Sequence, residues 1–141
     1  MKFEIRSYSH SVGEFNFHIQ FTAAYRKPIF SDVRVLQLTR AYLLEKAQFL
    51  NVNVKAIEFG RDHVHIFVIN CKNIAPAKLI QQLKGFSSRM MRKHHWNLFR
   101  HHLWGNKFWS EGYFCRSIGA TTTDAVKYYI EKSQQKHWEE N

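Results

Sequence analysis

Two consecutive strand-like segments joined by a very short turn constrain the fold more than any other feature of this chain. The segments are 53–59 (NVKAIEF) and 63–69 (HVHIFVI), and Gly60-Arg61-Asp62 lies between them. Both are rich in β-branched and aromatic residues, which predicts two antiparallel strands in a tight hairpin. The hairpin is flanked on both sides by sequence with a different periodicity.

Five further segments show strand or helix patterns. In chain order they are a half-buried strand over 14–24, a helix capped by Ser31 that runs to about Leu50, a helix from Ala75 to about Asn97, a pair of extended segments over 103–117, and a helix that opens at Thr121-Thr122-Thr123-Asp124 and runs to about His137. The order strand, helix, strand, strand, helix, strand, helix predicts an α+β fold. It is the split βαββαβ arrangement of a ferredoxin-like sandwich, with helices on one face of an antiparallel sheet and an extra C-terminal helix.

The composition fits a single folded domain over residues 1–141 with an anionic partner. Lys and Arg exceed Asp and Glu by 21 to 11, a net charge of +10, while 45% of residues are hydrophobic and 16% aromatic. A chain with so much apolar material is not a disordered basic tail, and nucleic acid is the commonest partner of a basic domain. No apolar run approaches the roughly 20 residues of a membrane span, and residues 1–11 lack a signal-peptide stretch. We therefore expect a soluble, cytoplasmic protein with no membrane association.

A His-Val-His triplet in the second hairpin strand is the sharpest chemical signal. Residues i and i+2 of a strand face the same side, so His63 and His65 can converge on one divalent ion at about 2.0–2.2 Å each. The alternative is a pair of hydrogen-bonded histidines on a polar sheet face. The other seven histidines, His18 among them, show no informative spacing.

The last predicted helix carries two adjacent tyrosines. At 100° per residue, Val126, Tyr129, Ile130 and Ser133 share one face, while Tyr128 points away from it. A tyrosine on such a face is usually part of a core. Next to a strand that carries a metal, however, a phenolate is a competent nucleophile toward phosphorus.

Basic and aromatic residues supply candidate DNA contacts. The basic candidates are Arg26, Lys27, Lys84, Arg89, Arg92 and Lys93, and the aromatic ones are Trp104, Phe108, Trp109, Tyr113 and Phe114. The basic residues fit phosphate contacts or an ordinary solvated helix face. The aromatic residues fit base stacking, a core or a dimer interface.

Four segments in fixed order resemble a known family. GRDHVHIFV, LIQQLKGFSSRMM, LWGNKFWSEGYFCRSIG and VKYYIEKSQ together resemble the HUH single-tyrosine transposases of the smallest prokaryotic insertion sequences, over about residues 15–134. The resemblance implies a homodimeric enzyme that cleaves and rejoins single-stranded DNA at hairpin-bearing element ends. It also implies a covalent 5′-phosphotyrosine intermediate, so strands are rejoined without ATP and no nucleotide cofactor is expected.

The resemblance also assigns roles at the site. His63 and His65 match the pair that binds Mg²⁺ or Mn²⁺, and Tyr129 matches the nucleophile. The family usually places a Gln, the third metal ligand, four residues after the tyrosine, where this chain has Ser133. Gln134 follows, and a local π-bulge would bring it into place. Otherwise Ser133, water or Asp62 completes the coordination.

Two other functions use only part of these features. A non-catalytic module that binds single-stranded nucleic acid accounts for the charge and the aromatic residues, but it gives no role to the histidine pair or to Tyr129. A metal-dependent nuclease that acts through water uses the histidines and needs no tyrosine.

Overall fold

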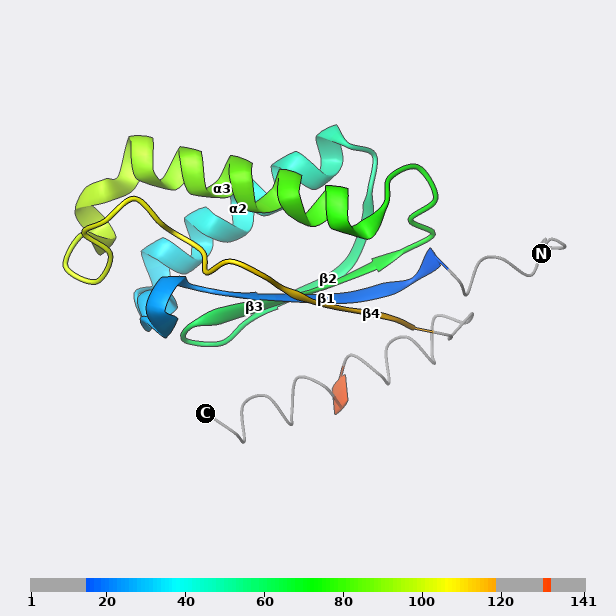
Figure 1. Ribbon diagram of the computed structural model, residues 1–141, viewed down its shortest axis with the longest axis horizontal. Helices are drawn as coiled ribbons and strands as arrows, with labels where there is room; N and C mark the ends of the chain where they lie inside the picture. Colours follow the sequence, from blue (N-terminus) through cyan, green and yellow to red (C-terminus); the bar gives the residue numbers. More distant parts are fainter. Residues whose placement is uncertain (1–14, 119–130, 133–141) are drawn as a thin grey trace, which may run out of the picture.

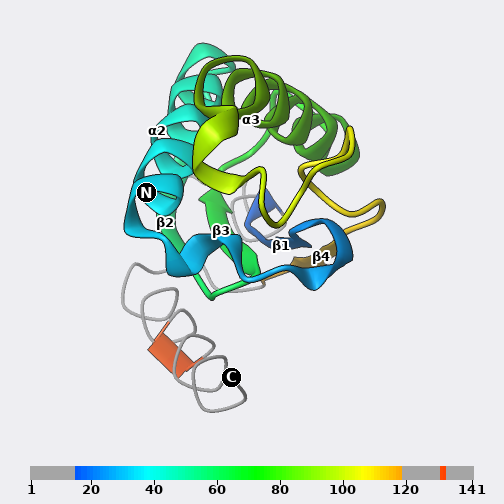
Figure 2. The same ribbon diagram turned by 90° about the vertical axis from the view of Figure 1, so that its left-hand side faces the viewer.

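Four antiparallel strands form one sheet in the order β2-β3-β1-β4, and two helices cover one of its faces (Figures 1 and 2). The structure, a computed structural model, describes residues 15–118 and 131–132. The elements are β1 (Phe17–Thr22), α2 (Val33–Phe49), β2 (Asn53–Phe59), β3 (His63–Ile69), α3 (Pro76–Phe99) and β4 (Phe114–Ser117). This arrangement confirms the predicted α+β ferredoxin-like sandwich.

The β2–β3 hairpin has the predicted boundaries, but β1 is shorter than predicted. Its last residue is Thr22 rather than Ala24, because the chain turns there into a 3₁₀ turn over Ala24–Arg26. Tyr25 and Arg26 both have positive φ values, 58° and 55°, a backbone region that side chains other than glycine seldom adopt. The strand therefore stops at a sharp, strained turn beside the hairpin end of β3.

The first helix is capped one residue later than predicted. Asp32, not Ser31, is the N-cap, because its Oδ1 accepts a hydrogen bond of 2.9 Å from the backbone N–H of Arg34. Ser31 belongs instead to a 3₁₀ turn over Ile29–Ser31. At the other end of the helix Phe49 leaves 75% of its surface exposed.

The predicted pair of extended segments over 103–117 contains only one strand. Phe114–Ser117 pairs with β1, whereas Trp109 makes only an isolated bridge to Ala23. Phe108 and Trp109 lie in the core, where the Trp109 ring meets Phe21 edge to face at 4.6 Å. Burial of these aromatic rings, rather than a strand ladder, therefore holds this segment against the sheet.

The hydrophobic core lies between the sheet and the two helices. The sheet contributes apolar side chains from β1 and β3, namely Ile19, Phe21, Val64, Ile66 and Val68. Helix α3 contributes buried residues along its length, namely Leu79, Ile80, Leu83, Ser87, Met91 and Phe99. Among residues 15–118 and 131–132, no helix combines the length and the apolar character that a membrane span requires.

The predicted C-terminal helix lies mostly outside the described residues. Of this helix the structure describes Glu131 and Lys132, which are helical and exposed. Figures 1 and 2 place this short segment on the side of the sheet away from α2 and α3.

A buried hydrogen bond between α3 and the 103–113 segment gives a test of this packing. The Trp109 indole N–H donates to Ser87 Oγ at 2.9 Å, and Ser87 Oγ in turn donates to the Leu83 carbonyl. Ser87→Ala should lower the free energy of unfolding by about 1–3 kcal/mol in urea denaturation, because the indole N–H loses its acceptor inside the core.

Ser88→Ala is the matched control, since it makes the same change one position further along α3. Both variants gain the same helix propensity, so their difference isolates the buried hydrogen bond. Equal stabilities of the two variants would contradict the packing described.

Candidate active site

The face of the sheet away from the helices carries a cluster of histidines. In the β1–β3 register His63 lies opposite Thr22, and His65 lies opposite Gln20. Directly opposite residues of antiparallel strands share a face, so these side chains lie together on the side away from Val64 and Ile66. We call this side, which His18, His63 and His65 define, the histidine face.

The His63 ring is oriented by a carboxylate. His63 Nδ1 donates to Asp62 Oδ1 at 2.5 Å, and Arg26 Nε donates to Asp62 Oδ2 at 3.1 Å. Burial alone would raise the pKa of the Asp62 carboxyl, but the hydrogen bonds from His63 and Arg26 hold that pKa below its usual value. Asp62 is therefore ionised at neutral pH, and it fixes the His63 proton on Nδ1.

The His65 ring is oriented by a second imidazole. His18 Nε2 lies 2.6 Å from His65 Nδ1, and the two rings are 4.9 Å apart. The His18 ring also stacks on Phe67 at 4.5 Å and meets the edge of Phe114 at 5.6 Å. His18 therefore fixes the plane of the His65 ring, as Asp62 does for His63.

Burial withdraws this cluster from water. His18, His63 and His65 are only 6%, 4% and 5% exposed. Burial, with a smaller contribution from the charge of Arg116, lowers the pKa of His18 to about 4. The His18 ring is therefore neutral at pH 7.

His63 and His65, brought together as predicted, have ring centroids 5.3 Å apart. The other predicted members of the site, Tyr129, Gln134 and Ser133, lie outside the described residues. Within residues 15–118 and 131–132 no group of three or more His, Cys, Asp or Glu side chains could hold a metal ion. Asp62 is one of the predicted alternatives for the third ligand. Its carboxylate instead accepts a hydrogen bond from Nδ1 of His63.

Two of the predicted DNA-binding residues hold the 104–113 loop. Lys84 Nζ donates to the carbonyl oxygens of Ser110 and Gly112 at 2.7 and 2.8 Å. Arg92 donates to the carbonyl oxygens of Lys107 and Gly105. These bonds give Lys84 and Arg92 a structural role, and phosphate contact by either residue stays a prediction.

The remaining basic candidates are placed differently. Arg26 pairs with Asp62, while the Lys27 ammonium lies 5.9 Å from the centre of the Trp104 ring. Arg89 and Lys93 are exposed on α3, which covers the opposite face of the sheet from the histidines. Among the aromatic candidates, Phe108 and Trp109 are core residues, whereas Trp104, Tyr113 and Phe114 are exposed.

Comparison with known proteins decides the family. The sequence profile of the family described as "Transposase IS200 like" matches residues 11–133, which is most of the chain. The chain belongs to the IS200-like transposase family. A search of curated proteins gave no significant match.

Solved transposase structures share this fold. A Deinococcus radiodurans R1 protein described as a transposase superposes with a TM-score of 0.65 at 24% identity, covering 83% of this chain and 88% of the other. A REP-associated tyrosine transposase bound to a REP hairpin gives a TM-score of 0.54 at 12% identity, covering 86% of this chain and 68% of the other.

In this transposase His18 and the orienting role of Asp62 were not predicted from the sequence. A signal for His18 existed, because His18, Gln20 and Thr22 alternate with the apolar residues of the first strand. Once that strand pairs antiparallel with β3, those three residues must share the face of His63 and His65. Which residue lies opposite which depends on the register, and the register is not readable from one strand alone.

Proposed function

We propose that this chain is a metal-dependent transposase that cleaves and rejoins single-stranded DNA at hairpin-bearing element ends. In this proposal Tyr129 is the nucleophile, and a covalent 5′-phosphotyrosine is the intermediate. His63 and His65 bind Mg²⁺ or Mn²⁺, Gln134 is the third ligand, and the protein acts as a homodimer.

The observation that carries the proposal is the orientation of the two imidazoles. In each ring Nδ1 is held by a hydrogen bond. Nδ1 of His63 bonds to Asp62, and Nδ1 of His65 bonds to His18. Metal-binding histidines commonly use one ring nitrogen for the metal and anchor the other to a carboxylate or another acceptor. The Nε2 atoms of His63 and His65 are then the ligand atoms, and both rings are held in place before an ion binds.

The donor set fits a divalent cation. Imidazole ligands carry no negative charge, so the charge of the ion is left to be balanced by the DNA phosphate and by carboxylates of this face. Asp62 is itself paired with Arg26, and Glu58 lies directly opposite His65 on β2. When bound, such an ion polarises the phosphate and stabilises the charge that develops on its oxygens.

Chain geometry is compatible with delivery of Tyr129 to this face. Strand β4 ends at Ser117, level with Phe17. The β1 residues opposite His65 and His63 lie three and five residues further along, about 10 and 17 Å in the strand direction, and β3 lies two strand spacings, roughly 10 Å, across the sheet from β4. The predicted helix rises about 12 Å between Thr121 and Tyr129. Glu131 and Lys132, just after Tyr129, lie on the same side of the sheet as the histidines.

The proposed step conserves the energy of the broken bond. The Tyr129 phenol oxygen forms a bond to phosphorus while the bond from phosphorus to the 3′ oxygen breaks. The phenol proton is lost to solvent, and the leaving 3′ oxygen takes up a proton to give a free 3′-OH. Attack by another 3′-OH on the phosphotyrosine reverses the step and joins the strands.

The exposed basic residues suit contacts to the phosphates of the DNA. Arg89 and Lys93 lie on the helical side of the sheet, away from the cleavage point, and Arg26 and Lys27 lie beside it. The relative bound to a REP hairpin supports a hairpin as the structured part of the substrate. Lys84 and Arg92 contribute through the loop that they hold.

Replacement of Tyr129 tests the nucleophile. The protein is incubated with single-stranded oligonucleotides from the ends of its own element and with Mn²⁺, and the products are run on denaturing gels. The wild type should give a covalent protein–DNA adduct, and Tyr129→Phe should give none, because the attacking oxygen is gone. His65→Ala should reduce the adduct by at least about 100-fold.

Tyr128→Phe is the matched control and should keep its adduct. An adduct that persists in Tyr129→Phe and disappears in Tyr128→Phe would reassign the nucleophile. Cleavage without any adduct would instead indicate a nuclease that acts through water, and binding without cleavage would indicate a non-catalytic module.

Asp62 and His18, which bond to Nδ1 of the two metal-binding imidazoles, should control the affinity for the metal. Asp62→Asn and His18→Phe should each weaken Mn²⁺ binding by about 10- to 100-fold in isothermal titration calorimetry, because the ligand rings lose their anchors. Asp32→Asn, which changes a carboxylate at the start of α2, should bind Mn²⁺ like the wild type. Unchanged affinity in both Asp62→Asn and His18→Phe would place the metal elsewhere.

A further inference from the structure

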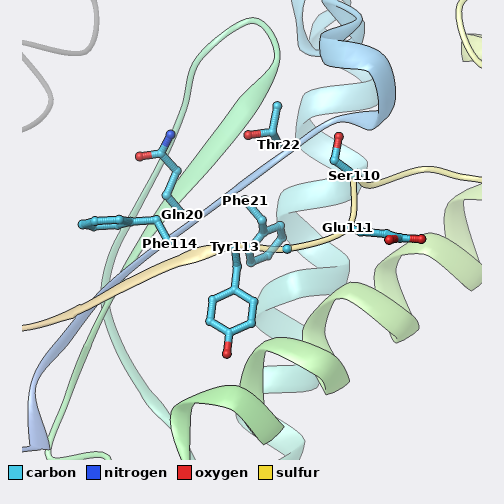
Figure 3. A pocket seen from close by; sticks show the side chains of 8 residues that line it. Gln20, Phe21, Thr22, Ser110, Glu111, Tyr113 and Phe114 are labelled. Atoms are coloured by element: carbon cyan, nitrogen blue, oxygen red, sulfur yellow. The ribbon is translucent and has the colours of Figure 1, made fainter.

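The edge of β1 is open where β4 begins, and a cavity of about 240 Å³ lies there (Figure 3). The β1–β4 ladder stops at the pair Gln20–Phe114. Two residues beyond Gln20 the edge of β1 is paired again, where the Ser110 N–H donates to the Thr22 carbonyl at 2.8 Å. The residues between, 111–113, leave the sheet. The cavity is lined by Gln20, Phe21, Thr22, Ser110, Glu111, Gly112, Tyr113 and Phe114.

Hydrogen bonds from several residues hold the loop that forms the wall of this cavity. Lys84 reaches from α3 to the carbonyl oxygens of Ser110 and Gly112, and it does so although burial lowers its pKa. The Ser110 hydroxyl donates to the Ala23 carbonyl at 3.0 Å. Gly112 turns the chain with a φ of 85°, which side chains strongly disfavour. Several independent interactions therefore hold the loop away from β1.

The cavity adjoins the histidine face. Gln20 lies directly opposite His65 on one side and directly opposite Phe114 on the other, so the three side chains form a row across the sheet. Thr22 lies opposite His63. The Phe114 ring also touches the edge of His18 at 5.6 Å. A ligand in the cavity is thus about two strand spacings, roughly 10 Å, from β3.

The lining suits a planar, uncharged heterocycle better than a phosphate. Tyr113 and Phe114 are 50% and 46% exposed, and Gln20 and Thr22 add an amide and a hydroxyl. Of the described residues that line the cavity none is cationic, and its one carboxylate, Glu111, is paired with Lys107. In Figure 3 the Gln20 and Phe114 side chains extend to the same side, and Tyr113 points away from them.

The size of the cavity agrees with this chemistry. A volume of 240 Å³ holds about eight water molecules at about 30 Å³ each, which is room for one nucleobase and not for a base pair. Aromatic rings bind unpaired bases by stacking, and an amide reads their edges because it both donates and accepts hydrogen bonds.

We propose that this cavity binds one unpaired base of the DNA strand, next to the phosphodiester that lies over His63 and His65. The base stacks on Phe114, and Gln20 contacts its edge. The proposal rests on the proposed function in taking single-stranded DNA as the ligand. It adds that the protein itself, through a base pocket, selects where along the strand the phosphate meets the metal ligands.

Binding of short oligonucleotides with and without bases tests the pocket. Fluorescein-labelled dT12 and a 12-mer of abasic residues carry the same phosphates, so the ratio of their dissociation constants measures the contribution of the bases. Fluorescence anisotropy without added metal should give a ratio of at least about fivefold for the wild type. Phe114→Ala should lower that ratio by about fivefold or more, down to a limit of one, because the ring on which the base stacks is lost.

Phe49→Ala is the control, because Phe49 is an aromatic residue that is more exposed than Phe114, 75% against 46%, and lies at the end of α2 outside the cavity. It should leave the ratio unchanged. Melting temperatures of both variants establish that they fold. A wild-type ratio retained in Phe114→Ala would overturn the proposal.

Photocrosslinking gives an independent readout that needs no variant. A dT12 with one 5-iodouracil, irradiated with the wild type and digested, should yield crosslinked peptides that contain residues 110–114. Crosslinks confined to other peptides would overturn the pocket. Adduct formation on element ends is measured separately, so adducts without a base effect reject only the pocket, and a base effect without adducts rejects only the proposed chemistry.

Discussion

The antiparallel pairing of β1 with β3 is the constraint on which the rest of this site depends. It places Gln20 opposite His65 and Thr22 opposite His63, and it brings His18 within 2.6 Å of His65. A slip of one residue would turn both histidines of β3 into the core and Val64 and Ile66 out of it. The apolar face of the sheet beneath α2 and α3 therefore keeps the histidines on the opposite face, because a slip by one residue would expose the core.

The histidine cluster is withdrawn from water. Burial lowers the pKa of His18 to about 4, so this ring is neutral, and neutral imidazole is the form that binds metals. Asp62, the carboxylate that orients His63, is paired with Arg26 from the strained turn after β1, and Glu58 lies directly opposite His65 on β2. The proposed cation would add positive charge to this face, and the DNA phosphate would add negative charge.

Local patterns in the sequence predicted well those helices and strands whose structure is determined within one segment of the chain. The β2–β3 hairpin and the two helices follow from periodicity and turn residues, and His63 and His65 share a face because a strand has a period of two. Other features depend on partners distant in the chain. The role of His18 requires the β1 register, and the bonds of Lys84 to the carbonyl groups of a loop 26 to 28 residues away require the tertiary fold. The segment over 103–117 was predicted as a pair of extended segments, yet only Phe114–Ser117 is a strand, and Phe108 and Trp109 are buried in the core.

The central claim is that both imidazoles and the Tyr129 phenol meet around one cation on the histidine face. Anomalous diffraction from crystals of the protein loaded with Mn²⁺ tests it most directly. The account predicts one strong peak about 2.2 Å from Nε2 of both His63 and His65, with the Tyr129 oxygen of the same or the partner subunit facing it. A peak bound by neither histidine, or a Tyr129 ring packed beneath α2 and α3, would contradict it.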